Sequence, residues 1–175
     1  VNGNVYCAIT NGNTVRTIVQ TAGTLTITGN VSPGVFYNIA SQTINFSGAT
    51  LTINGQITPG GVGHGILTSG VTTITGNVNS PSNTAAYAVQ ASSTLTVNGD
   101  VYGAAGGYGL YTISANTITI SGSIYGGVGY SIYATANPTI TVSGSVYAGP
   151  NPGIIVLGAG TVNLTRGSMY NYRGR

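Results

Sequence analysis

Residues 24–31 read TLTITGNV, and this phrase returns along the whole chain. It recurs as TLTINGQI at 50–57, TTITGNV at 72–78, TLTVNGDV at 94–101, TITISGSI at 117–124, TITVSGSV at 139–146 and, more loosely, TVNLTRGSM at 161–169. The opening NGNVY is the tail of the same phrase. Its glycines follow one another at 26, 26, 21, 23, 23, 22 and 23 residues: Gly3, Gly29, Gly55, Gly76, Gly99, Gly122, Gly144 and Gly167. A steady period of this length is typical of stacked repeat folds.

Apolar and polar residues alternate within each phrase. Leu25 and Ile27 alternate with threonines, as Ile118 and Ile120 do, and a period of two indicates a β-strand with one face buried. The residue two places after each glycine is always apolar, which predicts a second inward column: Val5, Val31, Ile57, Val78, Val101, Ile124, Val146 and Met169. A third apolar stretch follows a loop of variable length, at 35–39, 66–67, 87–89, 110–113, 132–133 and 154–157.

Three short strands in each unit predict an all-β fold, a parallel β-solenoid (β-helix) of about eight coils with about 23 residues each. Successive coils of such a stack lie about 4.8 Å apart. The glycine after the first strand is expected to permit a corner. Crossover chirality in parallel sheets favours a right-handed coil. The expected organisation is one solenoid domain over residues 1–167, with 168–175 as the last strand and a basic tail.

Two other fold classes fit less well. A helical fold is disfavoured because β-branched Thr, Ile and Val, with Gly every few residues, oppose helices. An antiparallel sandwich also has short alternating strands with Gly turns. Its strands need different residues, however, whereas each coil of a solenoid stacks on a near copy of itself. The identity of residues down each column therefore favours the solenoid.

Charged residues make up only 3% of the 175 residues. They are Arg16, Asp100, Arg166, Arg173 and Arg175, beside a single His64 and a single Cys7. Glycosidase, metal-dependent and serine-triad chemistry all need more carboxylates, imidazoles or thiols than these. We therefore expect no enzyme, no catalytic residue, no metal site and no cofactor. The scarcity of charge also follows from stacking, because a repeated charge would face its own copy about 4.8 Å away.

The few charged residues are interpreted without ligands. Nucleic acid is not an expected partner, since phosphate binding needs clustered cations along a groove. Arg166, Arg173 and Arg175 are interpreted as a solvated tail in preference to an anion site. His64 and Asp100 are interpreted as ordinary loop residues. No run of eighteen apolar residues occurs, so no membrane span is expected.

Threonines form a predicted ladder on the outward side of the first strand. Rungs about 4.8 Å apart make a flat hydroxyl array that ice lattices match in size. The alternative is structural, because Thr suits an exposed strand and bonds to its copy one rung away. The outward Thr ladder comprises Thr24, Thr26, Thr28, Thr50, Thr52, Thr73, Thr75, Thr94, Thr96, Thr117, Thr119, Thr139 and Thr141.

Tyrosines form a second predicted ladder one residue beyond the inward column. Stacked rings rigidify a solenoid, and the alternative role is contact with sugars or with another subunit. Tyr108, Tyr111, Tyr130 and Tyr133 are expected nearby, in or before the third strand. The Tyr ladder comprises Tyr6, Tyr102, Tyr125, Tyr147 and Tyr170, with Ser32, Thr58 and Asn79 between.

Both ends of the sequence continue the repeat without an evident polar cap. Such ends favour end-on stacking into a filament, although a cut fragment of a longer protein would look the same. The expected end contacts are Val5, Tyr6, Cys7, Met169 and Tyr170. Cys7 is interpreted either as a small buried residue or as a partner in an inter-chain disulfide. In a secreted protein Asn30, Asn45 and Asn163 are candidate glycosylation sites, because each begins an N-x-[ST] sequon.

The motif T-Φ-T-Φ-x-G-x-Φ, in which Φ is apolar, resembles the Thr- and Gly-rich β-strand repeats of bacterial surface proteins and phage virion fibres. This resemblance covers essentially the whole chain. It implies a structural subunit or segment of an extracellular or virion-surface fibre, assembling end to end or as a trimer, with adhesion to a glycan or receptor as a secondary role. The motif is also similar in part to the TxT faces of β-helical antifreeze proteins, which implies ice binding as the alternative. Antifreeze coils are short, nearly invariant and closed by disulfides, whereas this chain has ragged loops and one Cys.

Overall fold

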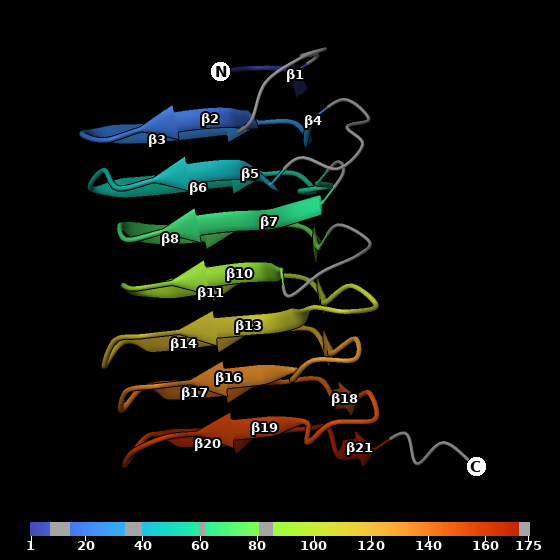
Figure 1. Cartoon of the computed structure of the whole chain (residues 1–175). Coiled ribbons are helices and arrows are strands. Elements are labelled where there is room, and N and C mark those ends of the chain that lie inside the picture. The colour runs from blue at the N-terminus through green and yellow to red at the C-terminus, as the bar shows by residue number, and fades with distance from the viewer. Residues whose placement is uncertain (8–14, 34–39, 60–61, 81–85, 172–175) are drawn as a thin grey trace.

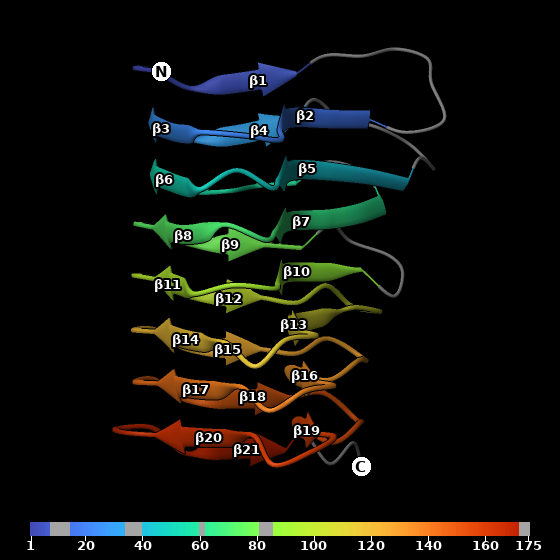
Figure 2. The same cartoon turned by 90° about the vertical axis from the view of Figure 1, so that its left-hand side faces the viewer.

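The computed structural model describes residues 1–7, 15–33, 40–59, 62–80 and 86–171. These residues form parallel strands that stack coil upon coil from one end of a rod to the other (Figure 1). Three sheets run the length of the rod, and each coil passes through all three in turn (Figure 2). The prediction of an all-β parallel β-solenoid is confirmed, and the described residues contain no helix.

Sheet A is built from the strands that carry the Thr-rich phrase. Its seven strands pair in sequence order because every phrase stacks on the one before. They are β3 (Thr24–Thr28), β6 (Thr50–Asn54), β8 (Val71–Ile74), β11 (Leu95–Val97), β14 (Thr117–Ile120), β17 (Thr139–Val142) and β20 (Thr161–Leu164).

Sheet B follows the glycine corner. In the second coil it narrows to a single residue, Ile57, which bridges Val31 and Val78. Its strands are β1 (Val5–Cys7), β4 (Val31–Pro33), β9 (Val78–Asn79), β12 (Val101–Tyr102), β15 (Ile124–Tyr125), β18 (Val146–Ala148) and β21 (Met169–Asn171).

Sheet C contains the third strand of each coil. The first of these strands, β2, had no counterpart in the predicted third stretches, and β5 begins just after the predicted 35–39, which lie outside the described residues. The strands are β2 (Val15–Gln20), β5 (Ala40–Phe46), β7 (Val62–Thr68), β10 (Tyr87–Ala91), β13 (Tyr108–Thr112), β16 (Ile132–Ala134) and β19 (Ile154–Val156).

The stack has about six turns of about 22 residues, fewer and shorter than the predicted eight coils of 23. The prediction counted every glycine phrase as a coil. The first phrase contributes β1 to sheet B but no strand to sheets A and C. Sheets A and C have seven strands each, and six steps from coil to coil connect the first strand to the last. The right-handed sense stays a prediction.

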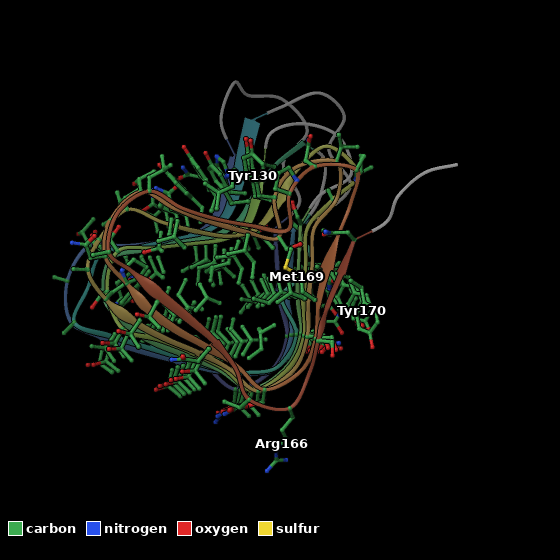
Figure 3. The ribbon with its side chains drawn as sticks, turned by 90° about the horizontal axis from the view of Figure 1, so that it is seen from below. Tyr130, Arg166, Met169 and Tyr170 are labelled. Carbon is green, nitrogen blue, oxygen red and sulfur yellow. The ribbon has the colours of Figure 1, made fainter. Side chains whose placement is uncertain are left out.

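The core fills the space between the three sheets (Figure 3). The inward column after the glycines is fully buried through the middle of the rod, from Val31 to Val146. Sheets A and C add residues such as Ile53, Ile66 and Ile118, each with no exposed surface. Burying one such side chain contributes about 1.5–3 kcal/mol, so the core is the main source of stability.

Candidate functional site

The outward face of sheet A presents the predicted Thr ladder. Its central column is in direct register over six coils and ends at Asn163: Thr26, Thr52, Thr73, Thr96, Thr119 and Thr141. Beside it Thr24 pairs with Thr50 and Thr117 with Thr139, while Val71 interrupts this second column. Thr28 and Thr75 belong to the column nearest the corner.

Among the described residues, no hydroxyl of the ladder makes a hydrogen bond. The hydrogen bonds expected between Thr side chains of neighbouring rungs are therefore not formed, and these hydroxyls face solvent.

The outward face of sheet B carries the Tyr ladder. Rings of Tyr102, Tyr125, Tyr147 and Tyr170 stack at 4.7, 4.6 and 5.0 Å between centroids, with interplanar angles of 7°, 2° and 11°. Tyr6 shares the column but pairs with Ser32 and is 70% exposed. Its hydroxyl accepts a hydrogen bond from Asn4 Nδ2 at 3.0 Å. The stack therefore occupies the C-terminal half of the rod.

Sheet C carries an aromatic cluster, which we define as His64, Tyr87, Tyr108, Tyr111, Tyr130 and Tyr133. The closest rings are Tyr87 and Tyr111, whose centroids are 4.5 Å apart at 20°. Tyr111 stacks on Tyr133 at 5.5 Å, and Tyr130 is tilted by 50° against Tyr108. Every ring of the cluster thus lies beside at least one other ring, with centroids 4.5–6.0 Å apart, and all six side chains are half-buried.

His64 was predicted to lie in a loop, but it lies within strand β7. Its ring stacks on Tyr87 with centroids 4.8 Å apart, and its Nδ1 accepts the Tyr87 backbone N–H at 3.1 Å. Burial lowers the pKa of His64 from its ordinary value. Burial, followed by the neighbouring Tyr111, raises the pKa of Tyr87. The loop interpretation failed because Gly63 and Gly65 flank His64 within the strand.

The residue after each corner glycine forms a column that sequence reasoning missed, named here the corner column. Side-chain oxygens in this column accept backbone N–H groups of the next coil at 2.7–3.2 Å: Asn4 from Asn30, Asn30 from Gln56, Asn77 from Asp100, Asp100 from Ser123, Ser123 from Ser145 and Ser145 from Ser168. Asp100 is therefore a member of this column and not an ordinary loop residue. Its second oxygen accepts the Tyr102 hydroxyl at 2.9 Å, which raises the pKa of Tyr102.

The ends of the rod expose the columns that are buried elsewhere. Met169 lies on the inner side of sheet B and is 43% exposed, whereas Tyr170 lies on its outer side (Figure 3). At the other end Val5 is half-buried, and Cys7 pairs with Pro33 within sheet B. Arg166 points away from the corner between sheets A and B (Figure 3), while Arg173 and Arg175 lie outside the described residues.

The three sequon asparagines lie in different surroundings. Asn30 belongs to the corner column, and Asn45 donates from Nδ2 to Gln42 Oε1 at 2.9 Å. Asn163 is exposed at the end of the central Thr column. Only Asn163 thus presents its amide without a partner among the described residues.

Comparison with known proteins names no relative for this repeat. No protein-family profile, curated protein or solved structure matches the chain. The resemblance to fibre and antifreeze repeats rests on the motif alone. Within the described ranges no three His, Cys, Asp or Glu side chains gather as a metal site would require. The same ranges contain no helix long and apolar enough to cross a membrane.

Proposed function

We propose that the chain is a structural, non-enzymatic β-solenoid, a segment or subunit of an extracellular or virion-surface fibre that grows through its ends. The observation that carries this proposal is the end rung: Val146 is fully buried, whereas Met169, the next residue of its column, is 43% exposed. A further coil would remove this surface from water, whether it came from a second copy or from a longer chain. Adhesion is a secondary role, for which Tyr170, 52% exposed at the end of the Tyr ladder, offers a ring with a single stacked neighbour.

The two ends match column by column in sheet B. If β1 of a second copy lay beside β21, its Val5 would cover Met169 and its Tyr6 would extend the stack from Tyr170. Ser168 Oγ would meet the backbone N–H of Asn4, as the corner column does between coils. Such a joint adds one rung to sheet B, while sheets A and C end at β20 and β19 and resume at β3 and β2. Head-to-tail contact of this kind generates an open filament.

Sedimentation velocity at rising concentration, with electron microscopy, tests end-to-end growth. The parent chain is expected to form lengthening rods. Met169→Asp places a carboxylate in the joint, where an unpaired charge is costly to bury, so this variant should stay short. The matched control is Ser121→Asp, which adds the same charge to the exposed face of sheet A and should assemble normally. A parent chain that stays monomeric at every concentration contradicts the proposal.

Ice binding is the second candidate, and the unpaired hydroxyls of the central Thr column favour it. Thr96→Tyr and Thr119→Tyr each place a ring in the middle of that column, which would break the flat hydroxyl array. We expect either change to abolish thermal hysteresis, and Thr58→Tyr, in the column that already contains tyrosines, to leave it unchanged. Absence of thermal hysteresis in the parent chain removes this candidate.

A further inference from the structure

We infer that the outer face of sheet C is a lateral interface that pairs with the same face of a second copy pointing in the same direction. This inference goes beyond end-to-end growth, since it concerns the side of the rod. Its starting point is one column in unbroken register across the seven strands of sheet C. Five of its members are apolar or aromatic: Val19, Asn45, Leu67, Gln90, Tyr111, Tyr133 and Ile155.

Exposure distinguishes this face from a buried sheet. Val19 is 53% exposed, and Ile113 and Leu157, just beyond the ends of β13 and β19, are 44% and 55% exposed. The aromatic cluster borders these residues in the C-terminal half. Contiguous exposed apolar and aromatic surface is characteristic of protein contacts. The outer face of sheet A, by comparison, is almost entirely Thr, Asn and Ser.

Charge and ring geometry favour another protein surface over a sugar. The strands of sheet C contain Arg16 and His64 but no Asp, Glu or Lys. A second copy therefore meets this face with little repulsion. A sugar ring would stack on an exposed aromatic face, whereas each clustered ring is half-buried and already has another ring beside it. Ring edges suit edge-to-face contacts with the tyrosines of another copy.

Repeat spacing identifies the occupant as a second copy of this chain. Side chains on this face recur once per coil, about every 4.8 Å. A partner with the same rise keeps its side chains in step along the whole rod, and among parallel β-solenoids an identical chain also matches the order of side chains from rung to rung. A parallel arrangement also brings the two aromatic halves together. An antiparallel arrangement would instead place Tyr111 and Tyr133 against the coils of Leu67 and Asn45, because Gln90 is the middle of the column.

The available area is sufficient for a stable pair. The strands of sheet C are three to seven residues long, and at about 3.3 Å per residue and 4.8 Å between strands they give roughly 570 Å² per copy. Two such faces bury about 1,100 Å², above the roughly 1,000 Å² that a specific interface needs. The pairing relates the copies by a two-fold axis parallel to the rod, so each rung meets its own equivalent.

Sedimentation equilibrium of the Met169→Asp variant tests this lateral interface. End-to-end growth is blocked in that variant, so the result does not depend on whether the parent chain grows through its ends. We expect a species of two chains. Ile113→Gln with Leu157→Gln should weaken that dimer at least about 10-fold, because both side chains are exposed apolar groups of the face. Val71→Gln is the matched control, since it removes an exposed apolar group from sheet A, and should leave the dimer unchanged.

Chemical cross-linking tests the direction of pairing in the folded protein. Ile155 lies in β19, at the C-terminal end of the central column, so a two-fold axis along the rod places it opposite its own copy, whereas antiparallel pairing would place it against Val19. With Cys7 replaced by Ser, a short bis-maleimide should join two Ile155→Cys chains if the copies are parallel. Failure of that cross-link, with Gln90→Cys chains joined instead, overturns the parallel arrangement. A monomer at all concentrations, a dimer unaffected by the double substitution, or a monomer that binds a neutral polysaccharide through this face overturns the interface itself.

Discussion

Single residues in the corner column join one coil to the next. Asn, Asp and Ser serve equally there because each has an oxygen at a short reach from the backbone. Gln56 is one methylene longer, and its Nε2 donates to Thr58 Oγ1 at 3.1 Å instead of following the column. Asp100 is thus an equivalent of Asn whose carboxylate also accepts the Tyr102 hydroxyl.

Asp100→Asn is expected to cost little, because the amide oxygen can accept the Ser123 N–H. Its amide nitrogen can then donate to the Tyr102 hydroxyl, as Asn4 does to Tyr6. Asp100→Ala leaves a partly buried N–H without its acceptor and should cost about 1–3 kcal/mol. Urea unfolding of both variants measures the difference. Equal losses would show that the side-chain acceptor does not join these coils.

His64 makes stability depend on pH. Its pKa is lowered below the ordinary 6.5 by burial, so the unfolded chain takes up the proton at higher pH than the folded chain. Stability is therefore complete above about pH 6.5, falls as the pH drops through that value, and stops falling below the folded pKa. Thermal unfolding between about pH 7 and pH 5 should show this fall in the parent. His64→Gln, which retains an acceptor but does not titrate, should unfold at a nearly constant temperature, and parallel curves would contradict the assignment.

At the scale of elements, the corner between sheets A and B needs glycine for space more than for its dihedral angle. Gly3, Gly29 and Gly76 have positive φ, whereas Gly55 does not. A Cβ on Gly55 would overlap the carbonyl oxygen of Gly29 in the preceding coil. The corner predicted from backbone freedom is thus mainly a point where two backbones touch.

Gly55→Ala should therefore destabilise the protein by about 1–3 kcal/mol through overpacking, although the φ of Gly55 is not positive. Gly3→Ala is the informative comparison. A Cβ at that position meets no atom within 4 Å, but its φ of 115° is strained for alanine. Denaturant unfolding should show the larger loss for Gly55→Ala, and the reverse order would assign the corner to backbone conformation.

The Tyr ladder stabilises sheet B only where its rings have neighbours. Tyr125 stacks on Tyr102 and on Tyr147, so Tyr125→Ala removes two ring contacts and should cost about 1–3 kcal/mol. Tyr125→Phe retains both contacts and should be nearly neutral. Tyr6→Ala serves as a control because Tyr6 has no ring contact among the described residues. Equal unfolding midpoints for Tyr125→Ala and Tyr6→Ala would contradict a stabilising stack.

The inward, Thr and Tyr columns could be predicted from sequence because alternation within a short phrase determines which face each residue occupies. The start of β5 could not, since the segments before sheet C vary in length and no column identity locates the strand. The corner column was missed for a different reason. Asn, Asp and Ser are ordinary turn residues, and only the register between coils reveals that Asp100 accepts from Ser123.

At the scale of the whole molecule, the low charge of the chain is expected to be a condition for stacking. Thr96 and Thr119 face each other in direct register on sheet A. Glutamate at both positions should cost about 0.5–1 kcal/mol more than the sum of the two single changes. Thr96→Glu with Thr119→Lys should cost less than the sum. Urea unfolding at low and high salt measures both cycles, and the coupling should shrink in salt. Additive costs in both pairs would leave the charge deficit unexplained.

The direction of the hydrogen bonds between coils has a mechanical consequence. Strands lie across the rod, and β1 and β21 lie at its opposite ends, so these bonds run along the long axis (Figure 1). A pulling force between the termini would peel one coil at a time, each releasing about 22 residues of slack. A force across the rod would shear the strands of a coil together and meet far greater resistance. The rod should therefore extend in small steps at modest tension while resisting sideways load.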